Sequence, residues 1–333
     1  MKGTPMLRVA IVGLGNIGKT HARYYAQNND VKLVALCDML AERVDPVAAQ
    51  YGVPAYHDLA AMLAAEQIDA ISVATAGPEN GGHHYEPTIQ ALEAGKHVLV
   101  EKPISNNIEH ARAMVAKAKE RGLLLGVNLN HRCTPACDRA RKLLADGELG
   151  EVLAVNMNLW INNPNESSPW FHLRALHPHS LDIMRCFGGP VQRVSAFMHK
   201  GPGRQIWSNT GVNLQFASGA VGHLTGSYDG SMLHPIERLE VLGSKGRVVV
   251  DNVFENLTFY PRGSLEKLVI DNPIFGGMGS FDETFKRRID LFVAQVQAGG
   301  PLDASGDDGL AVQEIIEAAI RSWEHSSVET VAG

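Results

Sequence analysis

The sequence predicts an α/β fold whose first half is a doubly wound parallel sheet, followed by a second domain of different architecture. Three observations carry this prediction. Short apolar runs alternate with helix-like segments, a glycine-rich loop follows the first run, and the second half holds strand-like runs divided by glycines. We expect residues 1–127 to form the first domain and residues 128–333 to form the second.

The composition is that of a globular protein with a small partner. Of 333 residues, 45% are apolar and 20% are charged, which suits about two domains with proper cores. The formal net charge is −6 and no run of lysine or arginine occurs, so we expect no nucleic-acid partner. No apolar stretch approaches the roughly 18 residues of a membrane-spanning helix, so we expect a soluble, cytoplasmic protein that binds no membrane. The four cysteines are too scattered for a disulfide framework or a zinc site.

A nucleotide-binding loop is predicted directly after the first strand, "LRVAIV". The glycines follow the pattern G-x-G-x-x-G between a strand and a helix. The first permits a tight turn, the second lets the backbone approach a pyrophosphate, and the third lets the helix pack on the strand. The helix N-terminus then faces the phosphate charge. We expect cofactor contacts from the loop residues Gly13, Gly15, Asn16, Ile17 and Gly18.

Asp38 ends the second apolar run, "VKLVALCD", about twenty residues after the last glycine of the loop. A carboxylate at this position accepts hydrogen bonds from the ribose hydroxyls of the adenosine half. It also repels a 2′-phosphate, so the sequence favours NAD over NADP. Arg43 lies close enough in sequence to leave the use of both cofactors open.

The rest of the first domain continues the alternation. We expect helices over 41–52, 55–64, 85–95 and 108–122, and strands over 68–76, 96–103 and 123–129. Ligands of doubly wound sheets bind at the carboxyl ends of the strands, which places Thr75 and Glu101 near the cofactor. Lys102 follows at the same edge, and Pro103 disfavours an α conformation there, which gives the lysine a defined direction.

Two motifs resemble a known family. "GLGNIG" and "AGKHVLVEKPIS" are similar to the glucose-fructose oxidoreductase, inositol dehydrogenase and MocA (Gfo/Idh/MocA) family of NAD(P)-dependent oxidoreductases, and later segments extend the resemblance almost end to end. The resemblance implies a Rossmann domain followed by a domain on a large open, mostly antiparallel sheet. It also implies that the outer face of this sheet joins copies of the chain into a homodimer or homotetramer.

The second half is compatible with that fold. Strand-like runs separated by glycine-rich turns are "LAVNMNLW", "GVNLQFA", "AVGHLTGSY", "RLEVLG" and "RVVVDN". Two amphipathic helices are expected to close the chain, around 281–297 and 309–323, with their apolar residues in the core.

The resemblance also implies the catalytic groups. In the family the lysine of the E-K-P motif lies near the nicotinamide and the substrate hydroxyl, and a histidine at a helix start serves as acid/base. By motif position these are Lys102 and His179. Pro178 suits a first helical turn, and a helix N-terminus disfavours an imidazolium, so His179 is expected to be neutral. Asp182, one turn further on, is expected to orient its ring.

The chain departs from the family pattern in two places. Ala175 stands where an aspartate is usual, and His177 beside it is either a substitute ligand or a packing residue at the helix entry. The loop "TAGPENGGHHYEP" is longer than usual and is either a substrate-contacting segment or a solvated lid. Trp170, His172 and Arg174 are candidates for an altered pocket wall. Substrate contacts are expected from His177, Arg174, Asp182, Trp170, His84 and Asn130.

The predicted function is hydride transfer between NAD and a secondary alcohol of a sugar, cyclitol or related polyol, the small-molecule partner of the chain. Two alternatives stay open: an NAD-bound regulatory protein of the same fold, which Ala175 favours, and a glycosidase-like enzyme that uses NAD transiently. The histidines and Glu79 offer metal-ligand chemistry, but no pair sits four residues apart on a predicted helix. We therefore expect no metal.

Overall fold

The computed structural model describes residues 5–231, 236–253, 255–271 and 281–331. The chain divides into two compact units, one of residues 1–129 with 285–310 and the other of residues 130–284 with 311–333. The first unit therefore takes in a segment from near the end of the chain. The predicted division after residue 127 instead assigns residues 285–310 to the second domain.

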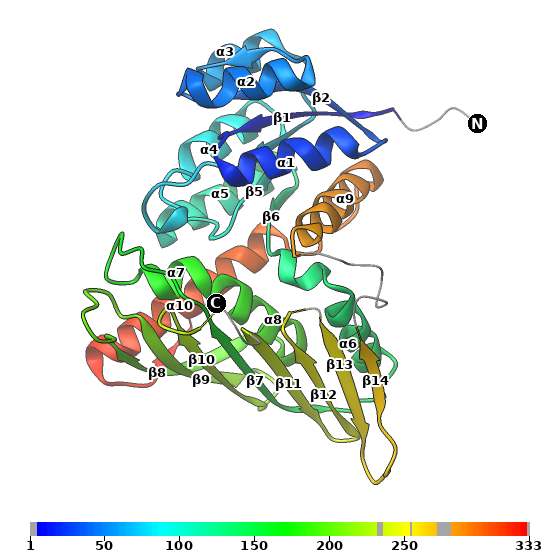
Figure 1. Cartoon of the computed structure of the whole chain (residues 1–333), viewed down its shortest axis with the longest axis vertical. Coiled ribbons are helices and arrows are strands. Elements are labelled where there is room, and N and C mark those ends of the chain that lie inside the picture. Colours follow the sequence, from blue (N-terminus) through cyan, green and yellow to red (C-terminus); the bar gives the residue numbers. More distant parts are fainter. Residues whose placement is uncertain (1–4, 232–235, 254, 272–280, 332–333) are drawn as a thin grey trace. The chain divides into compact units, whose positions relative to one another are not determined.

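A parallel sheet forms the centre of the first unit (Figure 1). Within the described residues its six strands lie in the order β3-β2-β1-β4-β5-β6, and every neighbouring pair is parallel. The order reverses direction between β1 and β4, which is where doubly wound sheets bind nucleotides. The predicted doubly wound sheet is thus confirmed. The strands are β1 Leu7–Val12, β2 Val31–Cys37, β3 Ala55–Tyr56, β4 Ala70–Val73, β5 His97–Val100 and β6 Leu125–Val127.

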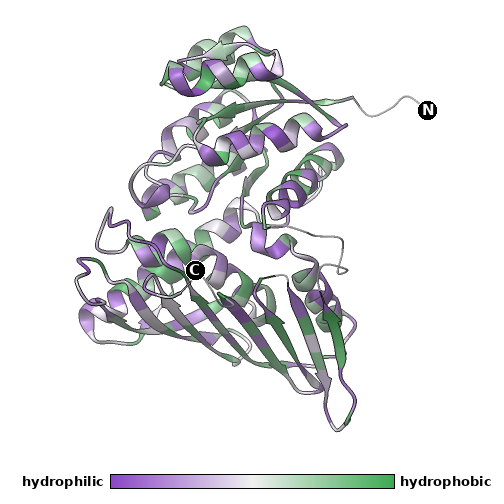
Figure 2. Cartoon of the chain, viewed as in Figure 1, coloured by the Kyte–Doolittle hydropathy of each residue, from purple (hydrophilic) through white to green (hydrophobic). Residues whose placement is uncertain are grey.

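Helices cover both faces of this sheet because successive strand residues point to opposite sides. In β1, which is mostly apolar (Figure 2), Val9 and Ile11 pack with α1, α2 and α9, whereas Ala10 and Val12 pack with α3, α4 and α5. Helix α9 comes from the returning segment and completes one face. The helices are α1 Asn16–Gln27, α2 Ala41–Tyr51, α3 Leu59–Ala65, α4 Tyr85–Glu93, α5 Ile108–Glu120 and α9 Glu283–Ala298.

One predicted helix of the first unit was wrong at its start. The expected helix over 55–64 begins instead with the short strand β3, and α3 starts at Leu59. Asp58 explains the change, because its side chain accepts a hydrogen bond from the N–H of Ala61 at 2.8 Å and so caps the new helix.

The second unit is built on a large open sheet (Figure 1). Its order, counted over the described ranges, is β14-β13-β12-β11-β7-β10-β9-β8-β15. Only the pair β7 and β10 is parallel among the pairings of these nine strands, so the predicted, mostly antiparallel sheet is confirmed. The strands are β7 Val152–Trp160, β8 Val191–His199, β9 Asn209–Phe216, β10 Val221–Ser227, β11 Glu237–Gly243, β12 Gly246–Asp251, β13 Asn256–Pro261, β14 Leu268–Asp271 and β15 Glu329–Thr330.

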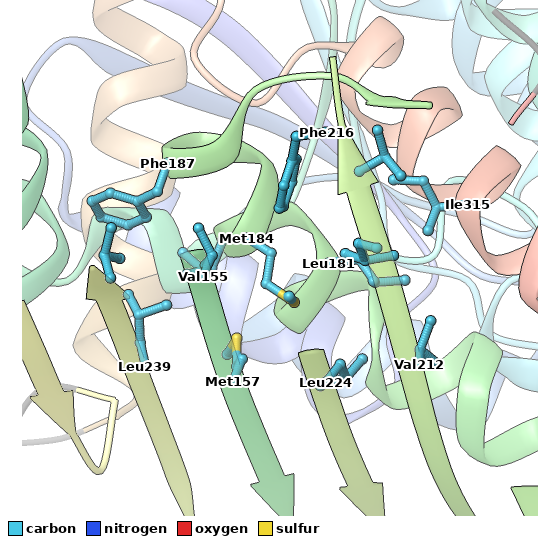
Figure 3. Packing of buried hydrophobic residues seen from close by; sticks show 14 of the residues in the cluster. Val155, Met157, Leu181, Met184, Phe187, Val212, Phe216, Leu224, Leu239 and Ile315 are labelled. Carbon is cyan, nitrogen blue, oxygen red and sulfur yellow. The ribbon is translucent and has the colours of Figure 1, made fainter. Parts of the chain in front are cut away.

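One face of this sheet carries the core of the second unit. Helix α8 (Pro178–Gly188) places Leu181, Met184 and Phe187 against apolar side chains of the strands, such as Val155 and Leu239 (Figure 3). Other helical segments of the unit are η2 Asn130–Cys133, α6 Pro135–Ala145, α7 Phe171–Leu176 and α10 Gly306–His325. No helix among the described residues has the length and apolar character needed to cross a bilayer.

The opposite face of the sheet is open and carries large apolar side chains. Phe197 is 69% exposed and Val221 is 56% exposed. Leu242 and Val221 both pair with Ala154 of β7, from the neighbouring strands β11 and β10. A hollow of about 610 Å³ on this face is lined by residues that include Trp160 and Phe197.

Candidate active site

The glycine-rich loop lies between β1 and α1 and has the close approaches that the motif predicts. A Cβ atom added at Gly13, whose φ is +91°, would lie 2.6 Å from the backbone nitrogen of Thr75. A Cβ atom at Gly18 would lie 1.8 Å from the carbonyl oxygen of Gly13. At Gly15, by contrast, a Cβ atom would meet no described atom within 4 Å. The fold itself requires glycine at positions 13 and 18. Gly15 is not required for packing, and the open space beside it fits a pyrophosphate.

The N-terminus of helix α1 follows directly after Gly15 and suits a bound phosphate. Gly15 is its N-cap and provides no side-chain cap, and the first turn contains no acidic residue. Asn16 and Ile17 are exposed in this turn. The first N–H groups of a helix have no partner within the helix, and the helix dipole favours an anion there. The residues present therefore fit the phosphates of a dinucleotide.

Asp38, at the end of β2, braces the same loop. Its Oδ2 accepts a hydrogen bond from the N–H of Leu14 at 2.7 Å, and its Oδ1 accepts one from the N–H of Leu40 at 3.0 Å. A carboxylate offers about four lone-pair sites, so these two bonds leave capacity for ribose hydroxyls.

Glu101, just after β5, belongs to a buried polar network. Its Oε1 accepts hydrogen bonds from His21 Nε2 at 3.0 Å and from the side-chain amide of Asn128, and its Oε2 accepts one from the N–H of Lys102 at 3.2 Å. The other ring nitrogen of His21 lies 2.7 Å from Ser72 Oγ. Burial raises the pKa of Glu101, but His21 and Asn128 outweigh it and hold the pKa below its usual value. The network thus fixes an ionised carboxylate directly before Lys102.

Burial lowers the pKa of Lys102, and the charge of Glu101 opposes that shift. An ammonium group with a lowered pKa gives up its proton more readily than an exposed lysine does. Lys102 lies in the first unit, at the edge of the sheet that also carries the glycine loop and Asp38.

His84 differs from its predicted place in a substrate pocket. Its ring is fully buried, with Nδ1 at 2.8 Å from the carbonyl oxygen of Pro103 and Nε2 at 2.5 Å from that of Thr75. Both nitrogens thus face backbone oxygens, and the ring joins the end of β4 to the segment after Lys102. Thr75 is tied further, because its hydroxyl donates to the carbonyl oxygen of His83 at 2.6 Å.

His179 lies at the start of α8 in the second unit, directly after Pro178, as predicted. It is 6% exposed. The ring of His131, from η2, is stacked on it with centroids 3.9 Å apart and an angle of 11° between the ring planes. His131 Nδ1 in turn lies 2.9 Å from Glu237 Oε2 at the start of β11.

Asp182 has a buried arginine partner, and its role in orienting His179 stays a prediction. It is paired with Arg132, whose Nε donates to Oδ2 at 2.6 Å and whose Nη2 donates to Oδ1. Both residues are buried. The planar guanidinium matches both carboxylate oxygens, a geometry that orients Asp182 towards the arginine. The pair anchors α8 to η2, beside His179.

His177 forms a buried pair with His172. Their Nε2 atoms are 2.9 Å apart, and His177 Nδ1 lies 3.0 Å from Ser180 Oγ. Burial lowers the pKa of His172 to about 3 and that of His177 well below its usual value, so both rings are neutral at pH 7. Both interpretations of His177, a substitute ligand and a packing residue at the helix entry, stay predictions. Ala175 lies nearby in an apolar cluster with Phe171 and Tyr228.

The remaining predicted contacts also have protein partners. Arg174 donates to both carboxylate oxygens of Glu317, from Nε at 3.1 Å and from Nη2 at 2.9 Å. The Trp170 ring is stacked on that of Trp207 with centroids 6.2 Å apart. Asn130 Nδ2 donates to Thr284 Oγ1 at 2.5 Å. These contacts differ from an open substrate-binding wall, and the substrate roles of these residues stay predictions.

The sequence did not predict two histidine–carboxylate contacts, His131 with Glu237 and His21 with Glu101. Glu237 is 106 positions away from His131, and Glu101 is 80 positions away from His21, so no local pattern joins them. Within the part of the chain that the structure describes, no group of three or more His, Cys, Asp or Glu side chains is arranged to hold a metal ion.

Comparisons with known proteins agree with this geometry. The family description "Oxidoreductase family, NAD-binding Rossmann fold" matches residues 7–129, and "GFO/IDH/MocA C-terminal domain" matches residues 137–249. The chain is 29% identical over 336 residues to an inositol 2-dehydrogenase of Rhizobium meliloti (strain 1021), covering 95% of this chain and 96% of that protein. Over 148 residues it is 40% identical to a D-glucoside 3-dehydrogenase of Escherichia coli (strain K12), covering 44% of this chain and 41% of that protein.

A solved structure has the same fold. Levoglucosan dehydrogenase in complex with NADH superposes with a TM-score of 0.87 at 22% identity, covering 98% of this chain and 99% of the other. This likeness extends over both units of the chain.

Proposed function

Because the chain belongs to the Gfo/Idh/MocA family of oxidoreductases, we propose that it transfers a hydride between NAD and a secondary alcohol of a sugar, cyclitol or related polyol. The observation that carries the proposal is the open glycine loop at the N-terminus of α1, with Asp38 beside it. The inositol and glucoside dehydrogenases among its relatives support a polyhydroxylated substrate. The resemblance on "GLGNIG" and "EKP" had predicted this activity.

Besides the cofactor, the proposed chemistry needs a group that stabilises the developing alkoxide and a group that accepts the hydroxyl proton. Bound NAD would accept the hydride from the carbinol carbon. We assign the stabilisation of the developing alkoxide to Lys102, whose direction is set by the Glu101 network. We assign acceptance of the hydroxyl proton to His179.

The proposed cofactor is NAD, with NADP the poorer one. The carboxylate of Asp38 is held beside the loop by two backbone N–H groups, so it keeps its place when a ribose arrives. A 2′-phosphate would meet this negative charge. Replacing Asp38 by serine is therefore expected to lower the ratio of kcat/KM with NAD to kcat/KM with NADP.

We propose that copies of the chain assemble through the open face of the nine-strand sheet. The exposed Phe197, Val221 and Leu242 support this, because a large apolar surface of this kind is typical of an interface between subunits. We further propose that the protein works in the cytoplasm, since all four cysteines are present as thiols.

Turnover tests the proposed function. The chain is incubated with NAD and a panel of inositols, aldoses and glycosides, and the absorbance of NADH is followed. Reduction of NAD by at least one polyol is expected. Tight binding of NAD without turnover on any member of the panel would favour the regulatory alternative, and release of free sugar from glycosides without net NADH would favour the glycosidase-like one.

A further inference from the structure

A second histidine lies flat against the proposed acid/base group. The rings of His131 and His179 are nearly parallel, at 11°, and their centroids are 3.9 Å apart. Both residues are 6% exposed, and they come from different elements, η2 and α8. The stack therefore restricts the ring plane of His179 from one side.

Glu237 holds His131 in this position. Its Oε2 atom lies 2.9 Å from His131 Nδ1, within hydrogen-bond distance, and Glu237 is only 6% exposed. The edge of Phe281 contacts the same imidazole, with centroids 5.3 Å apart and an angle of 82°. His131 is thus constrained by a hydrogen bond, a ring edge and a ring face.

We propose that His131, anchored by Glu237, is a positioning residue that fixes the ring plane of His179 for proton transfer from the substrate. The proposal rests on the proposed function, because it assigns a task to the base of that reaction. A ring stacked on one face of His179 prevents that imidazole from turning out of its plane. Because Glu237 holds His131, the orientation of His179 is set before the substrate binds.

The helix that carries His179 is itself fixed at this end. Arg132 and Asp182 form an ion pair that joins η2 to α8. Because His131 and Arg132 are neighbours in η2, the same short segment holds both the helix and the stacked ring.

Three variants separate the parts of the proposal. Glu237→Gln keeps the size of the side chain and removes its charge. His131→Phe keeps an aromatic face against His179 and removes the ring nitrogens. His131→Ala removes the stack as well. The matched control is Asp45→Asn, which alters a histidine–carboxylate pair at the same 2.9 Å, His57–Asp45, on the surface of the first unit.

The first measurement needs no substrate. Imidazole C–H signals are followed by NMR against pH in the cofactor-free protein, and the His179 signal is identified by its loss in His179→Asn. A stacked aromatic ring shifts the C–H signal of its neighbour through its ring current, so His131→Phe should keep the His179 signal upfield and His131→Ala should move it downfield. In turnover, kcat of His131→Ala should fall about tenfold below that of His131→Phe, with little change in KM. Glu237→Gln should give a kcat between those two values.

A His179 signal at the same position in His131→Ala and in the native chain, with similar melting temperatures, would overturn the proposal. So would equal kcat values in His131→Ala and the native chain. A displaced signal in a protein that oxidises no polyol would support the stacking of the two rings and count against the proposed function instead. The Asp45→Asn control should change neither quantity.

Discussion

At the scale of the residue, each proposed chemical group depends on neighbours that hold it. Lys102 follows a carboxylate that His21 and Asn128 fix in place. His179, in the first turn of α8, is stacked on an imidazole, and Asp182 of the same helix is paired with Arg132. Buried polar networks of this kind are rigid when all members are bonded, and that rigidity is what a hydride transfer requires.

Replacing His179 tests its role most simply. His179→Asn is expected to lower kcat by about 10²–10⁴-fold, the usual loss for a general base, because the alcohol proton has no acceptor. The affinity for NADH, followed by its fluorescence, should not change. A variant that keeps the native kcat would remove His179 from the mechanism.

The lowered pKa of Lys102 predicts an alkaline limit to activity. Burial disfavours the ammonium form, so the proton leaves below the ordinary lysine value of 10.5. If the cation stabilises the alkoxide, kcat/KM falls on the alkaline side as this proton is lost. Lys102→Arg keeps its charge throughout, so its residual activity should persist to higher pH. An alkaline limb at the same pH in the native chain and in Lys102→Arg would contradict the assignment.

Local sequence patterns could predict the cofactor residues but not the partners of the catalytic ones. Gly13, Gly18 and Asp38 act within a single strand–helix–strand unit, so their spacing carries the information. Asp182 is expected to orient His179 because the two are one turn apart, and its pairing with Arg132 was not predicted. That partner is 50 positions away and is supplied by the fold.

At the scale of the element, the loop before α1 contains one glycine that the fold requires, Gly18, and one that the proposed cofactor site requires, Gly15. Gly18 brings α1 against the carbonyl of Gly13, and Gly15 leaves its surroundings empty. Apart from β3, the strands described in the first unit were predictable because they are largely buried and read as apolar runs. Strand β14 was not predicted, since most of its residues are exposed and no buried face leaves a pattern.

Two alanine variants test these two requirements. Gly15→Ala, at a φ of −67°, should fold with unchanged or slightly raised stability, by up to about 1 kcal/mol, and should bind NAD at least about tenfold more weakly. Gly18→Ala should lower the free energy of unfolding by about 1–3 kcal/mol, because its Cβ atom meets backbone. Thermal melting and NAD titration measure both. Native NAD affinity in Gly15→Ala would show that the open space is not the pyrophosphate site.

At the scale of the whole molecule, the chain builds each unit from segments that are distant in sequence. Residues 285–310 return to the first unit, where Phe292 and Val293 of α9 enter its core. The sequence predicted a helix here with its apolar residues buried, and α9 has that character. Its assignment to the first unit was not predicted, because periodicity reports that a face is buried and not what covers it.

The open sheet face predicts self-association. Phe197→Asp places a charge within the apolar surface and should dissociate the assembly, because a buried carboxylate without a partner is costly. Sedimentation velocity of the native chain and the variant measures this. The control is Leu265→Asp, which alters an exposed apolar residue in the turn between β13 and β14 and should leave the assembly intact. A native chain that sediments as a monomer would exclude the proposed interface.

The central claim is that this chain reduces NAD with a secondary alcohol of a polyol and that His179 removes the proton. The most direct measurement is NADH formation over a panel of inositols and sugars by the native chain and by His179→Asn at equal concentration. The account predicts turnover of at least one polyol by the native chain and a loss of about 10²-fold or more in the variant. Full activity of His179→Asn, or no NADH from any polyol in the panel, would contradict it.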